Sequence, residues 1–202
     1  MSAKITEIIA EQSFEILTKE VGAILLLELD NQLNLEACSS GIDLGVFIER
    51  IEPVDKSEDV VVNVSLNNVN YDNHNEFTSQ GTHTFNIDVY AFGEASTDET
   101  ANDNVRIKLQ KITGWIRYIL QSTKYKTLGF APGFIGGTYV QSINFDDSFG
   151  KEDGAMTRMS RLVFSVRASE FQDSDELLAF TGNDTTIKLD LTDKGYKLIF
   201  NT

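Results

Sequence analysis

Two histidines with neighbouring carboxylates are the residues whose types come nearest to a metal site. His74 and His83 lie nine positions apart, and Asp72 and Glu76 lie on either side of His74. Imidazole and carboxylate groups bind a transition metal when three or four of them converge from rigid elements. These residues instead lie in an asparagine-rich stretch typical of a loop, so the sequence predicts no metal site.

Other motifs of catalysis or cofactor binding do not occur in the sequence. The acidic residues at 94, 98, 99 and 103 lack the spacing and the central glycine of an EF-hand. The glycines between 129 and 137 alternate with phenylalanines that would fill a phosphate site, and no GxSxG or Rossmann fingerprint is found. Cys38, the single cysteine, suits a small buried hydrophobe. We therefore expect neither an enzyme nor a cofactor.

The charge balance excludes one class of partner. The chain has 17 basic and 31 acidic residues, a net charge of −14, which disfavours a protein that grips nucleic acid by its phosphates. It is compatible with a surface past which nucleic acid slides. The start of the chain lacks the pattern of a signal peptide, and the longest apolar run, 21–27, is too short for a bilayer. We expect a soluble protein made in a cytoplasm, without a membrane partner.

One long helix, predicted over residues 94–121, organises the rest of the chain. Ser96 and Glu99 match a capping box at its start. Apolar residues then recur at steps of three and four, which predicts one continuous stripe that faces a sheet. The stripe consists of Ala101, Val105, Leu109, Ile112, Ile116 and Ile119.

The opposite side of this helix carries an unusual set of residues. Ile107, Lys111, Gly114 and Tyr118 fall on the side away from the stripe at 100° per residue. A glycine within a helix costs about 1 kcal/mol relative to alanine, so Gly114 suggests a second surface that comes close to the helix. The alternative is a tolerated exposed glycine beside two scattered hydrophobic residues.

The N-terminal half predicts a helix followed by strands. Residues 2–20 have the pattern of an amphipathic helix with a second apolar side, and 23–29 suit either its extension or a buried strand. A short strand is predicted over 45–52. Residues 59–71 and 82–92 alternate apolar and polar side chains, which predicts an antiparallel hairpin.

The C-terminal half predicts a second strand pair and an extension. Strands over 139–145 and 157–169 are joined by an acidic loop, 146–156. The Gly/Pro loop before them carries Phe130 and Phe134, which either fold under the domain or insert into a neighbouring chain. We predict an α+β domain over 1–169, with an antiparallel sheet of about four strands and helices on one face. Residues 170–202 form a second part that contains a β-hairpin.

The order of these elements resembles that of a known family. The N-terminal helix is followed by a strand pair ending in THTFNIDVYAF, by the capped helix ANDNVRIKLQKITGWIRYIL, and by a strand pair ending in RMSRLVFSVRAS. In this order, residues 2–169 resemble the tail terminator and neck proteins of tailed bacteriophages. The resemblance implies a ring, commonly a hexamer, that caps the tail tube and joins it to the head connector.

The resemblance also implies a location and partners. The protein would be a virion component assembled in the host cytoplasm, and would bind further copies of itself, the tail tube protein and connector or adaptor proteins. DNA would pass through the ring without specific binding, because an acidic lumen repels phosphate. Candidate oligomer interface residues are Ile107, Lys111, Gly114, Tyr118, Phe130 and Phe134. Candidate lumen residues are Asp146, Asp147, Glu152 and Asp153.

Three other functions remain open from the residues alone. A tail tube or baseplate component would polymerise into long tubes instead of stopping at a ring. A monomeric cytoplasmic binding module would hold a small ligand in the loop of Phe130 and Phe134. A metal-dependent enzyme would use His74 and His83 with their acidic neighbours.

Overall fold

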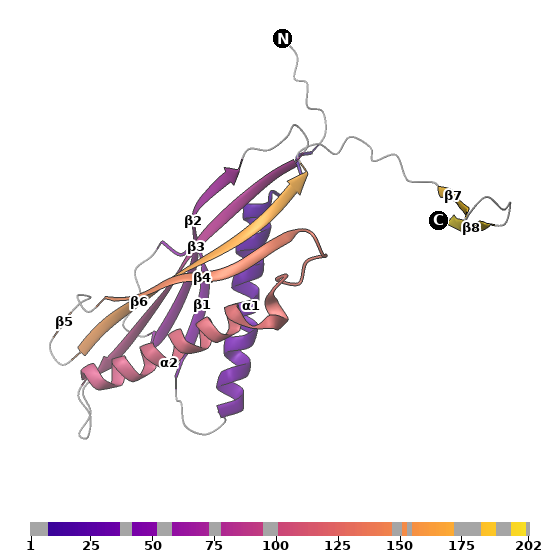
Figure 1. Cartoon of the computed structure of the whole chain (residues 1–202). Coiled ribbons are helices and arrows are strands. Elements are labelled where there is room, and N and C mark those ends of the chain that lie inside the picture. Colours follow the sequence, from indigo (N-terminus) through magenta and orange to yellow (C-terminus); the bar gives the residue numbers. More distant parts are fainter. Residues whose placement is uncertain are drawn as a thin grey trace, which may run out of the picture. The chain divides into compact units, whose positions relative to one another are not determined.

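The computed structural model describes residues 8–36, 42–51, 58–72, 78–94, 101–146, 151–152, 155–171, 183–188 and 195–200. The chain divides into two compact units, Met1–Glu170 and Phe171–Thr202. Among its described residues, the first unit contains two α-helices and a mixed sheet (Figure 1). Of the second unit the structure describes two strands, β7 (Asn183–Lys188) and β8 (Gly195–Phe200), which pair antiparallel.

The first unit is built on a mixed sheet of five strands in the order β1, β2, β3, β6, β4 (Figure 1). Strands β1 and β2 are parallel, whereas β2 with β3 and β4 with β6 are antiparallel. A two-residue strand, β5 (Lys151–Glu152), pairs with the start of β6. The five strands are β1 Leu44–Ile48, β2 Val60–Asp72, β3 Thr78–Glu94, β4 Ile135–Asp146 and β6 Ala155–Phe171.

The predicted hairpin is confirmed, but the predicted sheet of four antiparallel strands is wrong. Val62 lies opposite Val89 in the β2–β3 pair, as the alternating pattern requires. The additional strand is β1, which pairs in parallel with β2 and places Leu44 opposite Val60. Two parallel strands need a crossover connection between them. The residue pattern between Ile48 and Val60 does not predict such a connection. The sequence therefore indicated a short strand here without its partner or direction.

Helix α1 spans Ser13–Glu36 and lies further along the chain than predicted. Gln12 precedes it, and the Gln12 backbone N–H donates to Glu15 Oε2 at 2.8 Å. This is the return half of a capping box, which fixes the start at Ser13 and leaves residues 8–12 outside the helix. The ambiguous stretch 23–29 is helical. Because apolar residues occupy several sides of α1, its periodicity did not define where it begins and ends.

Helix α2 spans Ala101–Gln121, so it begins later than the predicted helix over 94–121. Glu94 is the last residue of β3, and the proposed cap at Ser96 and Glu99 lies outside the described residues. The apolar stripe is confirmed, since Val105, Ile112 and Ile116 are fully buried. Thr113 Oγ1 lies 2.7 Å from Ser160 Oγ in β6, and Lys108 forms an ion pair with Asp59 at 2.5 Å. These contacts hold α2 across the sheet.

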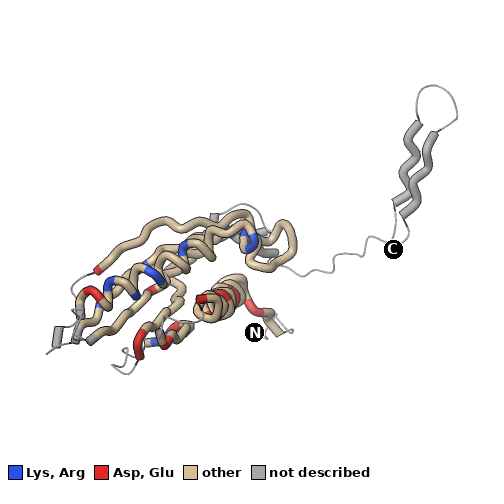
Figure 2. The backbone as a smooth tube through the Cα atoms, turned by 90° about the horizontal axis from the view of Figure 1, so that it is seen from below, with Lys and Arg blue, Asp and Glu red and all other residues tan. Residues whose placement is uncertain are grey.

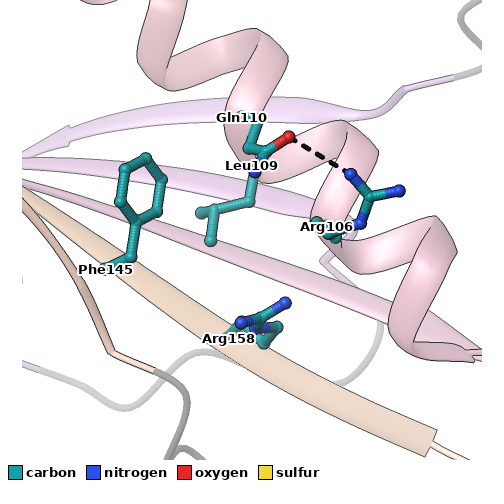
Figure 3. A pocket seen from close by; sticks show the side chains of 5 residues that line it. All are labelled: Arg106, Leu109, Gln110, Phe145 and Arg158. Atoms are coloured by element: carbon teal, nitrogen blue, oxygen red, sulfur yellow. Dashed lines mark hydrogen bonds between the residues drawn. The ribbon is translucent and has the colours of Figure 1, made fainter.

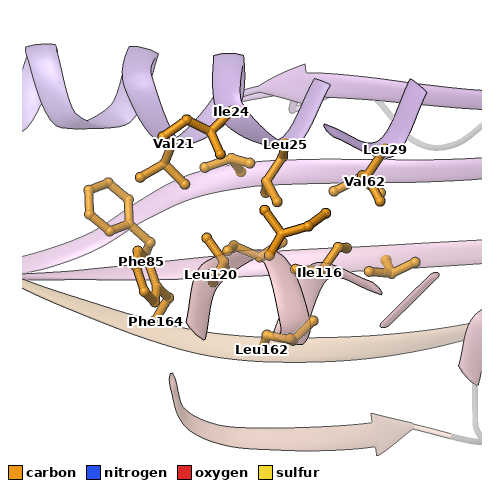
Figure 4. Close-up of a cluster of buried hydrophobic side chains, with 14 of the residues drawn as sticks. Val21, Ile24, Leu25, Leu29, Val62, Phe85, Ile116, Leu120, Leu162 and Phe164 are labelled. Atoms are coloured by element: carbon orange, nitrogen blue, oxygen red, sulfur yellow. The ribbon is translucent and has the colours of Figure 1, made fainter. Parts of the chain in front are cut away.

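Both helices pack on the same face of the sheet around one hydrophobic core (Figure 4). Side chains from α1, such as Val21 and Leu25, meet Ile116 and Leu120 from α2 above the strands. Phe85 and Phe164 lie beneath them, with ring centroids 6.5 Å apart. Helix α1 contacts β1 and β2, whereas α2 contacts β3 and β4. The helices therefore divide the sheet between them, α1 toward the β1 end and α2 toward the β4 end.

Candidate self-association surface

The outer face of α2, defined by Ile107, Gly114 and Tyr118, is exposed as the sequence predicts. Ile107 is 49% and Tyr118 is 78% exposed. A Cβ atom added at Gly114 would meet nothing within 4 Å, so no contact among the described residues requires a glycine there. The α2 outer face therefore has two large exposed side chains with open space at the glycine between them. This arrangement allows another surface to come close.

Lys111 has contacts within the subunit. Its Nζ atom forms an ion pair with the Glu36 carboxylate at the end of α1, and it lies 5.1 Å from the centroid of the Trp115 ring. Lys111 therefore joins the two helices in the isolated chain. It would contribute to an oligomer interface only by sharing or exchanging these partners.

Phe130 and Phe134 fold under their own domain. They follow a short 3-10 helix, η1 (Thr123–Tyr125), and their ring centroids are 4.9 Å apart. Both rings are half-buried and pack against the hydrophobic core. The sequence left open whether these rings fold under their own domain or insert into a neighbouring chain. The structure places them under their own domain, so a neighbouring chain would reach only their exposed edges.

The acidic lumen candidates are only partly described. Asp146 ends β4 and is exposed. Glu152 belongs to β5, where the backbone alone is described, and Asp147 and Asp153 lie outside the described residues. The structure therefore places one end of the acidic loop at the end of β4, and the lumen assignment stays a prediction.

A pocket of about 240 Å³ opens between α2 and the strands β4 and β6 (Figure 3). Arg106, Leu109 and Gln110 contribute from α2, Phe145 from β4 and Arg158 from β6. Phe145 is 51% exposed, whereas Leu109 is buried at the base. Arg106 donates to the Gln110 side chain at 3.5 Å, and Arg158 donates to Asn102 at 3.3 Å. We call this the Phe145 pocket; it offers an apolar wall between two guanidinium groups.

No motif in the sequence indicates the Phe145 pocket, although part of its signal is present. The predicted strands 139–145 and 157–169 pair as observed, and Phe145 lies opposite Ser160. That pairing brings Phe145 near Arg158, which is two residues away from Ser160. The position of α2 over this end of the strands is a tertiary contact, and no spacing in the sequence indicates it.

Charge is segregated between the two helices (Figure 2). Helix α1 has one basic residue, Lys19. Its acidic residues are Glu15, Glu20, Glu28, Asp30 and Glu36. Helix α2 has one acidic residue, Asp103. Its basic residues are Arg106, Lys108, Lys111 and Arg117. The net charge of −14 is therefore unevenly distributed, and α2 is a locally basic element of an acidic chain.

The sheet face opposite the helices is polar. Asp88 is buried there and accepts two hydrogen bonds from Arg161, at 2.7 and 2.8 Å. The hydrogen bonds to Asp88 raise the pKa of Arg161. Burial, with the Asp88 charge second, raises the pKa of Tyr90 on the same face. This face is held together by its own ion pair.

Of the two histidines, the structure describes His83. His83 is fully buried, and its Nε2 atom lies 2.7 Å from the Ser13 hydroxyl at the start of α1. Tyr71 packs edge-on against the His83 ring. His74, Glu76 and Cys38 lie outside the described residues. Within the described part of the chain, no three His, Cys, Asp or Glu residues are grouped as metal ligands. The structure thus gives His83 a packing role.

Neither helix of the described chain is long and apolar enough to cross a membrane. No protein-family model matches the sequence, and a search of curated proteins returned no match.

Proposed function

We propose that the chain is a structural virion protein that forms a ring by self-association. The ring terminates a tail tube or joins it to the head connector, and DNA passes through it. The function is geometric: the subunit completes the tube and presents a docking surface, with no bond made or broken. Its partners are further copies of itself, a tail tube protein and connector or adaptor proteins.

The observation that carries this proposal is the α2 outer face. One side of α2 is buried in the core, whereas Ile107 and Tyr118 are exposed on its other side. Gly114 lies between them and costs the helix about 1 kcal/mol, although alanine would fit the subunit. A second protein surface pressed against α2 accounts for both features, because glycine allows the backbone of a partner to come close.

The element order supports the same function. A strand pair, a long helix and a second strand pair follow one another, and the two described α-helices, α1 and α2, cover one face of the sheet. The family that the sequence resembles uses this arrangement in its rings. The element order supports the proposal by analogy with a fold, whereas the α2 outer face points to particular residues.

The test is native mass spectrometry of the whole chain over a concentration series, combined with Gly114→Leu. A Cβ atom at Gly114 meets nothing within 4 Å, so far-UV circular dichroism should not change in this variant, whereas the bulky leucine should abolish assembly. Asn31→Leu, at an exposed position of α1, is the matched control and should assemble normally. Both variants place a leucine at an exposed position of a helix.

The outcomes separate the competing functions. A closed oligomer without bound ligand supports the ring, whereas open-ended tubes indicate a tube component. A monomer that retains a small molecule through dialysis favours a binding module and contradicts the proposal. If the Gly114→Leu variant still assembles, the α2 outer face is not the interface.

A further inference from the structure

The proposed ring requires two different surfaces on each subunit, and the inference that follows rests on that proposed function. A closed ring with more than two subunits is held by head-to-tail contacts, in which one patch of a copy meets a different patch of the next. The α2 outer face is a single patch that points away from the sheet. The subunit must therefore also carry surfaces that point in opposite directions along the ring.

The two ends of the sheet supply such directions. Strands β1 and β4 are at opposite ends of the strand order. Helix α1 contacts β1, and α2 contacts β4, so each end of the sheet carries its own helix (Figure 1). The acidic helix is at the β1 end and the basic helix at the β4 end (Figure 2).

The β4 end carries the Phe145 pocket. Its apolar wall consists of Phe145 and Leu109, and the guanidinium groups of Arg106 and Arg158 lie at its margins (Figure 3). Arg106 is 3.8 Å from Asp103, an exposed pair that contributes little to the subunit and leaves Arg106 able to bind a further carboxylate. The pocket therefore suits an apolar side chain that is flanked by acidic groups.

The β1 end carries such side chains. Ile51 is 97% exposed, and Ile48 is partly exposed where it rests on Gly22 of α1. Leu26 and Asp30 follow Gly22 at steps of four, so they continue along the same side of the helix. Three exposed acids lie on the same elements: Asp30 on α1, Asp43 before β1 and Glu49 after it. We call the set of Leu26, Ile48, Ile51 and these three acids the β1 patch.

We propose that the Phe145 pocket of one copy binds the β1 patch of the next copy. The apolar side chains of the patch cover Phe145, and the acids of the patch pair with Arg106 and Arg158. The two guanidinium groups of the pocket attract the acids of the patch and steer the copies into this orientation, and like charge disfavours patch against patch. Repetition of the contact generates a ring or an open helix, according to the rotation between copies.

The test uses single-cysteine variants of the whole chain in a Cys38→Ala background. One variant carries Ile51→Cys in the β1 patch, and the other carries Phe145→Cys in the pocket. On mixing under mild oxidation, we expect the mixed disulfide dimer to exceed either self-linked dimer by about tenfold, because the contact raises the local concentration of the unlike thiols only. Asn68→Cys with Lys126→Cys, both exposed and outside the Phe145 pocket, the β1 patch and the α2 outer face, is the control pair.

Each result decides the proposal. A mixed disulfide of Ile51→Cys with Phe145→Cys, without one in the control pair, supports it. Equal cross-linking of the control pair shows random collision between copies and overturns it. If neither pair cross-links while native mass spectra contain a closed oligomer, the ring stands and this contact is wrong. If there is also no oligomer, the contact and the proposed function both fail.

Discussion

Arg161 Nε and Nη2 donate to the two carboxylate oxygens of Asp88, at 2.7 and 2.8 Å, on the sheet face that the helices leave uncovered. The pair joins β6 to its neighbour β3. The Asp88 side chain is 6% exposed, whereas that of Arg161 is 43% exposed. A carboxylate this deeply buried depends on its partner, because burial of an unpaired charge is costly.

Arg161→Ala should therefore destabilise the first unit. The variant leaves the Asp88 carboxylate without its two strongest donors, and we expect a loss of about 2 kcal/mol in the free energy of unfolding, below the range for a fully buried pair because Arg161 is partly exposed. Arg167→Ala is the control, since Arg167 is exposed on the same strand and face. Urea denaturation followed by circular dichroism measures both variants. Equal stability of the two would show that the pair contributes nothing.

Gly114→Ala should stabilise the isolated subunit. A Cβ atom at Gly114 meets nothing within 4 Å, so the variant gains helix propensity without a clash, about 1 kcal/mol. Thermal unfolding at a concentration where the chain is monomeric gives this value. A destabilised Gly114→Ala variant would contradict the open space at this position.

Gly22→Ala should not stabilise the subunit, although it is also a glycine-to-alanine substitution within a helix. Its Cβ atom would lie 2.6 Å from the Ile48 side chain, so the gain in helix propensity is offset by overpacking. The Gly22→Ala, Ile48→Ala double variant relieves this clash. We expect the double variant to be more stable than the sum of the two single effects, which a double-mutant cycle measures. Additive effects would contradict the contact.

Tyr125 should make the stability of the subunit sensitive to alkaline pH. Its hydroxyl donates to Glu28 of α1, and this hydrogen bond, followed by burial, raises the pKa of Tyr125 above its ordinary value of 10.0. Because the folded state holds the proton more tightly, this contribution is fully present below pH 10.0 and is lost as pH rises through the folded pKa.

The matching experiment compares Tyr125→Phe with the native chain across that range. The native protein should lose stability more steeply above pH 10.0 than Tyr125→Phe, which has no proton to release there. Parallel curves for the native chain and Tyr125→Phe would exclude the Glu28 hydrogen bond as the cause.

The elements that the sequence predicted well are those whose burial is periodic. Val105, Ile112 and Ile116 are buried on one side of α2, and Val62 and Val64 alternate with polar residues along β2. One covered face and one exposed face leave a period of 3.6 or 2 in the sequence. The same argument placed Ile107 and Tyr118 on the exposed side of α2, where they lie.

The remaining features depend on contacts between distant residues. The start of α1 is fixed by Glu15 and by the buried contact of Ser13 with His83, which is seventy positions away. The parallel pairing of β1 depends on a crossover, and the Phe145 pocket depends on where α2 crosses β4. None of these leaves a local period. Sequence reasoning therefore found the α2 outer face but missed the pocket beside it.

Charge reversal in the Phe145 pocket should weaken assembly selectively. Arg106→Glu places a carboxylate opposite the acids of the β1 patch, so we expect the midpoint concentration of assembly to rise by about tenfold or more, equivalent to about 1.4 kcal/mol. Sedimentation velocity over a concentration series measures this midpoint. Arg167→Glu makes the same charge change on the open sheet face and serves as the control.

Salt and a second reversal complete this test. Because the attraction acts between partly exposed charges, raising the ionic strength from about 0.1 to 1 M should weaken native assembly. Asp43→Lys in the β1 patch should be defective alone, yet should assemble when mixed with Arg106→Glu, since each supplies the charge that the other contact lacks. If the mixture fails although native assembly is salt-sensitive, the attraction lies between other surfaces of the chain.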